Sequence, residues 1–193
     1  MKTKYTRNEL AETVIRALAG GAVMLTLLIA PNAGRMFEVF GKDFLPPGRK
    51  NYKREERIRR AVARLKKKRQ VEIYERDGKT FVELTQAGKK RLLGYQFDDL
   101  TLKKPKRWDL IWRVVIFDIP EKKRRARDAL TGKLHELEFL KLQKSVWVTP
   151  FPCQDEIDFI SELLDIGDCL HYIEARSIDD EAKLQLYFKD ILL

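Results

Sequence analysis

The amino-terminal half of the chain carries apolar residues at helical spacing in two long stretches. In the first, the spacing and a cap at Asn8 predict a helix over about residues 9–30 that ends at Pro31. A short helix is expected over 34–40, and the prolines and glycines of 41–52 predict a loop. In the second stretch, 53–69, one apolar face made of Ile58, Ala61, Val62 and Leu65 predicts a helix packed on a core.

Strand-like runs follow on either side of Asp77-Gly78, a dipeptide typical of a two-residue hairpin turn. Pairing across this turn sets Ile73 opposite Val82 and Val71 opposite Leu84, which makes one face of the hairpin apolar. Helical spacing then restarts over 84–93, with Thr85 as a cap. The order of helices, basic helix, hairpin and helix predicts a winged helix over 1–95.

Residues 96–107 lack periodicity and hold Pro105 in a basic run, so we expect a linker there. Beyond it, the pattern predicts a strand at 111–118, a helix at 121–137, strands at 139–143 and 145–149, a helix at 156–164 and a strand at 169–176. This is the βαββαβ order of a ferredoxin-like domain over 108–193. A last segment, 179–193, is amphipathic and helical, with no signal for where it docks. The fold class is therefore α+β.

The balance of charge also changes where the predicted linker ends, between residues 107 and 108. Residues 1–107 hold 27 Lys and Arg against 12 Asp and Glu, whereas residues 108–193 hold 12 against 17. The predicted helix at 53–69 concentrates ten basic residues, and those opposite its apolar face are Arg57, Arg60, Arg64 and Lys67. Arg76 and Lys79 fall at the tip of the wing. These six residues are our candidates for contacting double-stranded DNA; the alternative for the helix is a solvated basic face.

The apolar run, the cysteines and the histidines bear on localisation, metal binding and catalysis. The apolar run 17–30 is shorter than a membrane span and predicts a buried helix, with a peripheral anchor as the alternative, so we expect a cytoplasmic protein. Cys153 and Cys169 have no metal-ligand spacing and indicate buried thiols in a reducing compartment. His135 and His171 lie on different predicted elements without a nucleophile pattern. We expect no metal and no cofactor.

The stretches WRVVIFDIPEKKRRARDAL, from 112, and LQKSVWVTPFP, from 142, resemble the central domain of PaaX-type transcriptional regulators, which is related to the CRISPR adaptation protein Cas2. The basic helix and wing are also similar to the winged-helix part of these regulators. The resemblance implies a homodimeric DNA-binding regulator, a repressor that binds an operator. The carboxy-terminal domain of the longer regulators is not seen here, which leaves their kind of effector binding without support.

Asp118 is the candidate for chemistry in this resemblance. It matches an aspartate that Cas2 proteins described as nucleases use for metal-dependent cleavage, paired with its copy across a dimer. One carboxylate per chain is little for a magnesium site, and an aspartate before Pro120 could instead cap the following helix or lie at a dimer interface. We favour the structural role. The alternatives to a regulator are a metal-dependent nuclease using Asp118 and a structural DNA-binding subunit of a CRISPR-related assembly.

Overall fold

The computed structural model describes residues 7–19, 51–76, 79–179 and 181–189, which belong to two compact units, Met1–Asp98 and Asp99–Leu193. The expected helical stretch over 20–30, the short helix at 34–40, most of the 41–52 loop and the Asp77-Gly78 turn lie outside the described residues.

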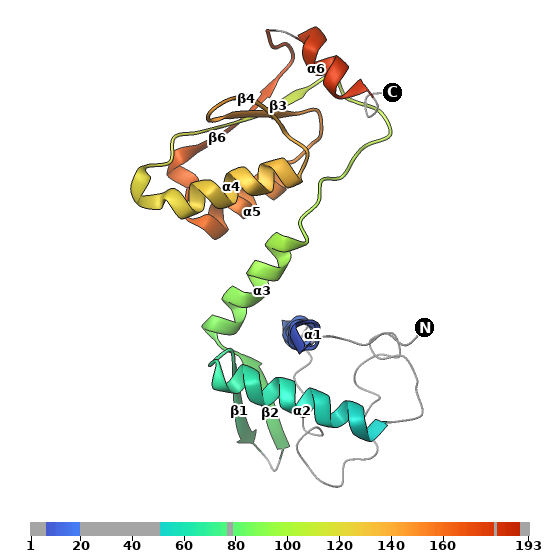
Figure 1. Ribbon diagram of the computed structural model, residues 1–193, viewed down its shortest axis with the longest axis vertical. Coiled ribbons are helices and arrows are strands. Elements are labelled where there is room, and N and C mark those ends of the chain that lie inside the picture. Colours follow the sequence, from blue (N-terminus) through green and yellow to red (C-terminus); the bar gives the residue numbers. More distant parts are fainter. Residues whose placement is uncertain (1–6, 20–50, 77–78, 180, 190–193) are drawn as a thin grey trace. The chain divides into compact units, whose positions relative to one another are not determined.

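The first unit contains helices α1 (Arg7–Ala19), α2 (Asn51–Lys67) and α3 (Gln86–Asp98) and a hairpin of β1 (Val71–Arg76) and β2 (Lys79–Leu84) (Figure 1). Its core combines α1, α2, the hairpin and α3, and its buried residues are Val14, Ile15, Ile58, Ala61, Val62, Leu65, Val71, Val82 and Tyr95. The four apolar residues predicted for the inner face of the basic helix are therefore all buried. The strand register is also as predicted, with Val71 opposite Leu84 and Ile73 opposite Val82.

Helix α3 begins as predicted but continues further. The Gly88 backbone N–H donates to Thr85 Oγ1 over 3.2 Å, which is the expected cap. The helix ends at Asp98 rather than near residue 93, so three residues expected in the linker are helical. Tyr95 explains the extra turn, because it is buried in the core and its carbonyl oxygen accepts a hydrogen bond from Arg16.

The second unit confirms the predicted order of strands and helices. Its elements are β3 (Trp112–Phe117), the 3₁₀ turn η1 (Glu121–Lys123), α4 (Arg124–Glu136), β4 (Leu140–Gln143), β5 (Val146–Thr149), α5 (Gln154–Leu164), η2 (Gly167–Cys169), β6 (Leu170–Ala175) and α6 (Glu181–Tyr187). The sheet order is β4-β5-β3-β6 with antiparallel neighbours throughout. A βαββαβ chain arranged in this way is a ferredoxin-like fold.

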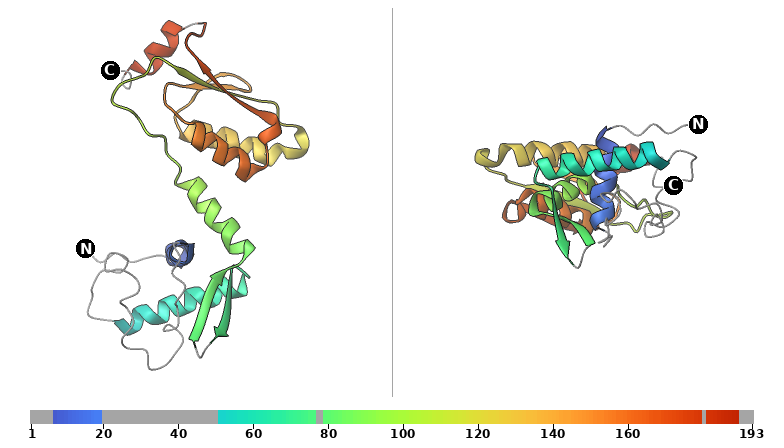
Figure 2. Two further views of the ribbon diagram at one scale, coloured as in Figure 1. Left: turned by 180° about the vertical axis from the view of Figure 1, so that it is seen from behind. Right: turned by 90° about the horizontal axis from the view of Figure 1, so that it is seen from below.

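Helices α4 and α5 cover one face of this sheet, and α6 lies over the other face (Figures 1 and 2). The site where α6 docks had no sequence signal. Leu184 and Phe188 pack there against Trp112, Val114 and Val148, all of them buried. Alternation along β3 explains this arrangement, since Trp112 and Val114 point to the α6 face while Arg113 and Val115 point to the α4–α5 face.

No helix within the described ranges is both long enough and apolar enough to cross a membrane. The apolar run 17–30 lies mostly outside those ranges, so the choice between a buried helix and a peripheral anchor stays a prediction.

Candidate nucleic-acid interface

The outer face of α2 carries a cluster of basic side chains. Arg57, Arg60 and Lys67 are exposed, and Arg64 is half-buried, while the opposite side of the helix is fully buried in the core. The amphipathic division predicted from the sequence is thus confirmed. That these four residues contact DNA remains a prediction.

Two further cations on this face were missed. Arg59 and Lys66 are exposed as well and lie on the other flank of the same outer surface. The four residues predicted from the sequence, Arg57 to Lys67, form a single stripe along one flank of the helix. A sequence signal for the second flank does exist. Basic residues stand three and four positions before and after Ala63, which is exposed, so they lie on both sides of it.

One of the basic side chains is already engaged within the helix. Arg60 Nη2 donates to Glu56 Oε1, an i,i+4 ion pair in which the side chains are 68% and 46% exposed. Exposed pairs of this type contribute about 0.3–0.5 kcal/mol. A phosphate group could therefore displace Glu56 from Arg60 at little cost.

The hairpin presents two different surfaces. The Cα partners next to the turn are Arg76 and Lys79, which puts these two candidates at the tip, as predicted. Nearer the base, the face away from the core carries Tyr74 stacked on Phe81, with ring centroids 5.4 Å apart. Glu72 lies directly opposite Glu83 on that same outer face. Since two carboxylates repel phosphate, any DNA contact by this hairpin belongs at the tip rather than at the base.

Asp118 is exposed and follows directly on β3. Its backbone N–H donates to the Cys169 carbonyl oxygen over 2.9 Å. The interpretation of Asp118 as a helix cap is wrong: the residue at the cap of η1 is Pro120, and no side chain makes a capping hydrogen bond there. The physical reason is that Pro120 is extended, with φ −63° and ψ 155°, and Ile119 is buried, so two residues separate the carboxylate from the first helical turn.

The surroundings of Asp118 offer little metal-binding chemistry. In the part of the chain that the structure describes, no group of three or more His, Cys, Asp or Glu side chains could hold a metal ion. His135 and His171 are both exposed, on α4 and β6. Cys153 is buried as expected, and burial raises the pKa of its thiol to about 12. Cys169 is half-buried, so the expectation of two buried thiols was wrong for this residue.

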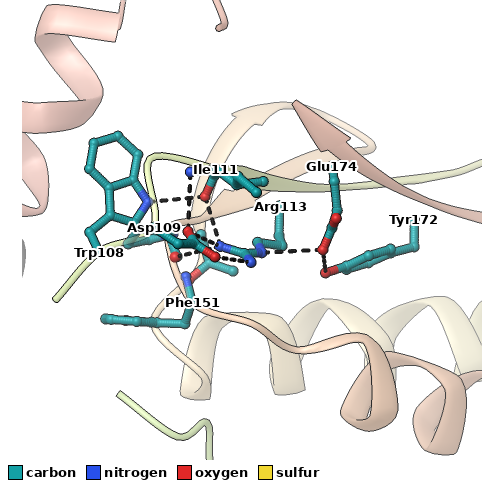
Figure 3. Close-up of polar contacts among 9 residues, drawn as sticks. Trp108, Asp109, Ile111, Arg113, Phe151, Tyr172 and Glu174 are labelled. Atoms are coloured by element: carbon teal, nitrogen blue, oxygen red, sulfur yellow. Dashed lines mark hydrogen bonds and ion pairs between the residues drawn. The ribbon is translucent and has the colours of Figure 1, made fainter. Parts of the chain in front are cut away.

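A buried arginine that the sequence did not reveal organises the start of β3 (Figure 3). Arg113 is 4% exposed, and its guanidinium donates two hydrogen bonds to the Asp109 carboxylate, of 2.6 and 2.5 Å. The guanidinium also donates to the carbonyl oxygens of Ile111 and Pro150. Arg113 Nε lies 3.6 Å from Glu174 Oε1. The hydrogen bond from Arg113 lowers the pKa of Asp109, and the same bond raises the pKa of Arg113.

This network holds a strained turn in place. Leu110 has a φ of 61°, a conformation that costs an L-residue about 1–2 kcal/mol. The Ile111 N–H donates to Asp109 Oδ1 over 3.1 Å, and the Trp108 indole N–H donates to the Ile111 carbonyl oxygen over 3.0 Å. Arg113 therefore ties the turn that enters β3 to the end of β5 and to β6. Its role is structural.

The second unit is thus a ferredoxin-like domain with one further helix on the open face of its sheet. Residues 105–187 match the family model described as the PaaX protein central Cas2-like domain, so this region is similar to that domain. No curated protein matches the chain.

Proposed function

We propose that this protein is a DNA-binding transcriptional regulator, a repressor that binds operator DNA with a winged helix in its first unit. The observation that carries the proposal is the basic outer face of α2, immediately before a hairpin, in a chain whose second unit is similar to the PaaX central Cas2-like domain. A helix buried on one side and cationic on the other meets the physical requirements of a recognition helix, because the core fixes its position while the cations neutralise phosphates.

Dimerisation belongs to the second unit in this proposal. The sheet face that carries α6 leaves apolar side chains in solvent, since Ile173 is 43%, Leu186 68% and Tyr187 57% exposed. A second copy covering these residues would place two winged helices on a palindromic site. The mass of the full chain in solution at micromolar concentration tests this part, and a monomer would contradict it.

Binding and cleavage assays on the same duplexes separate the candidate functions. A regulator protects one sequence in a footprint and leaves the DNA intact with Mg²⁺ or Mn²⁺. A structural subunit of a CRISPR-related assembly would bind without selecting a sequence. Metal-dependent cutting would favour the nuclease, for which a lone exposed Asp118 is the candidate residue. We expect selective protection without cleavage, with double-stranded DNA as the partner and no cofactor.

A further inference from the structure

An alanine lies at the centre of the basic face of α2. Ala63 is exposed, and its helical neighbours at three and four residues in both directions are Arg59, Arg60, Lys66 and Lys67, all of them exposed. The shortest side chain on this surface is therefore surrounded by four of the longest.

Helix geometry divides the four cations into two flanks. With about 100° per residue, Arg59 and Lys66 lie on one side of Ala63, and Arg60 and Lys67 lie on the other. Within each flank the two residues are seven positions apart, which is roughly 10 Å along the axis. Ala63 points away from the buried residues Ala61 and Leu65, so it lies on the outer side of the helix.

This pattern matches a helix that lies in the major groove of duplex DNA. The groove is bounded by a phosphate backbone on each side, and base edges form its floor. Two cationic flanks can each neutralise one backbone, and a small residue between them lets the helix approach the floor closely. A methyl side chain at this point can make an apolar contact with the C5-methyl group of thymine, as alanine does in direct readout.

We propose that Ala63 is the residue of α2 that touches a base edge, and that its methyl group reads a thymine. This inference rests on the proposed function. It assigns sequence selection to Ala63 and attributes phosphate binding to the residues on its two flanks. It also adds Arg59 and Lys66 to the DNA interface.

The first test selects bound sequences from a random duplex library with the full chain. Variants Ala63→Leu and Ala63→Gly are compared with the matched substitutions at Ala87, which is exposed on α3 of the same unit. Leucine keeps helix propensity but fills the space between the flanks. We expect Ala63→Leu to weaken binding to the wild-type site by about tenfold and to change the selected motif. Binding to an unrelated duplex should stay the same, and the Ala87 variants should behave like the wild type.

The second test removes the base methyl group alone. Each thymine of the selected site is replaced by uracil, which differs only at C5. At one position the wild type should lose about fourfold in affinity, the effect of one methyl-sized apolar contact. Ala63→Gly should lose nothing further at that same position, because the two methyl groups contact each other.

The outcomes separate this inference from the proposed function. A wild-type protein that selects no sequence overturns both. A wild type that selects a motif which Ala63→Leu also selects overturns the inference alone. So does a uracil substitution that weakens the wild type and Ala63→Gly equally at every position.

Discussion

A Cβ atom placed on Gly88 would lie 2.0 Å from the carbonyl oxygen of Gln70. The first turn of α3 therefore rests directly on the backbone that joins α2 to β1. Thr85 strengthens this junction, because its N–H donates to the same Gln70 oxygen over 3.2 Å and its hydroxyl donates to the Arg69 carbonyl oxygen. The junction fixes the hairpin relative to the basic helix.

Gly88→Ala should destabilise the first unit by about 1–3 kcal/mol, because the backbone must shift to admit the methyl group. Gly94→Ala in the same helix is the matched control: an added Cβ there meets nothing within 4 Å, and alanine should stabilise by about 0.5–1 kcal/mol. Hydrogen exchange of residues 71–98 measures both effects. Tryptophan fluorescence would not, since Trp108, Trp112 and Trp147 all lie in the second unit. Equal protection in the two variants would contradict the close packing at Gly88.

Asp109 makes the second unit sensitive to acid. The hydrogen bond from Arg113 holds its pKa in the folded state below that in the unfolded state. A carboxylate shifted in this direction stabilises the fold above its unfolded pKa of about 3.9, and this contribution is lost as the pH falls through the folded pKa. Asp109→Asn should therefore destabilise the unit near neutral pH, by about 1–2 kcal/mol after allowance for the half-exposed carboxylate. The gap to the wild type should begin to narrow below about pH 4 and close once the pH is below the folded pKa of Asp109.

Urea unfolding followed by tryptophan fluorescence across this pH range measures the gap. Asp128→Asn is the control, since Asp128 is 65% exposed and its oxygen lies 3.7 Å from Arg124. Such a pair contributes about 0–0.5 kcal/mol. A gap for Asp109→Asn that stays constant with pH would show that the Asp109 charge does not stabilise the fold.

Helix α6 and Phe188, the residue that follows it, should contribute to stability and to association through different side chains. Phe188 is 1% exposed and its ring centroid lies 6.0 Å from that of Trp112, so Phe188→Ala should cost about 3–5 kcal/mol and alter Trp112 fluorescence. Leu186 is 68% exposed, and Leu186→Ala should leave unfolding within about 0.5 kcal/mol of the wild type. If α6 lies at the dimer interface, the same Leu186 variant should weaken the dimer in sedimentation equilibrium. An unchanged dimer would remove Leu186 from the interface.

Substitution of Asp118 should change the free energy of unfolding very little. Because its carboxylate does not cap η1, both Asp118→Ala and Asp118→Asn should change unfolding by less than about 0.5 kcal/mol, rather than the roughly 1 kcal/mol that a lost cap would cost. The wild type and both variants should leave DNA and RNA intact in Mg²⁺ or Mn²⁺. Reproducible cleavage by the wild type that disappears in Asp118→Asn would assign Asp118 to catalysis.

The sequence predicted most of the fold because its elements carry strong local patterns. The alternation about Asp77-Gly78 set the hairpin register correctly, and the βαββαβ order followed from apolar stripes and short strands. The docking of α6 could not be predicted, since a seven-residue amphipathic helix specifies an apolar partner but not which one. In the structure, the apolar partners of Leu184 and Phe188 are on the open face of the sheet.

The errors arose where tertiary contacts outweigh local signals. An aspartate shortly before a proline is a plausible helix cap from sequence alone. In the structure, Ile119 is buried and Asp118 lies outside the first turn of η1. No local pattern marks Arg113, because its partners Asp109, Pro150 and Glu174 are spread over more than 60 residues of sequence. The basic face of α2 was found, but only along one flank, because a single helical stripe was followed.

The salt dependence of duplex binding tests the central claim most directly. The wild type, Arg60→Ala/Arg64→Ala and the charge-matched control Arg124→Ala/Arg125→Ala on α4 are titrated with one duplex over a range of salt concentrations. If α2 binds phosphates, the log–log slope of affinity against salt should fall by roughly 0.9 for each lost contact in the α2 variant and stay at the wild-type value in the control. A wild type that does not bind duplex DNA, or a slope unchanged by loss of Arg60 and Arg64, would contradict the account.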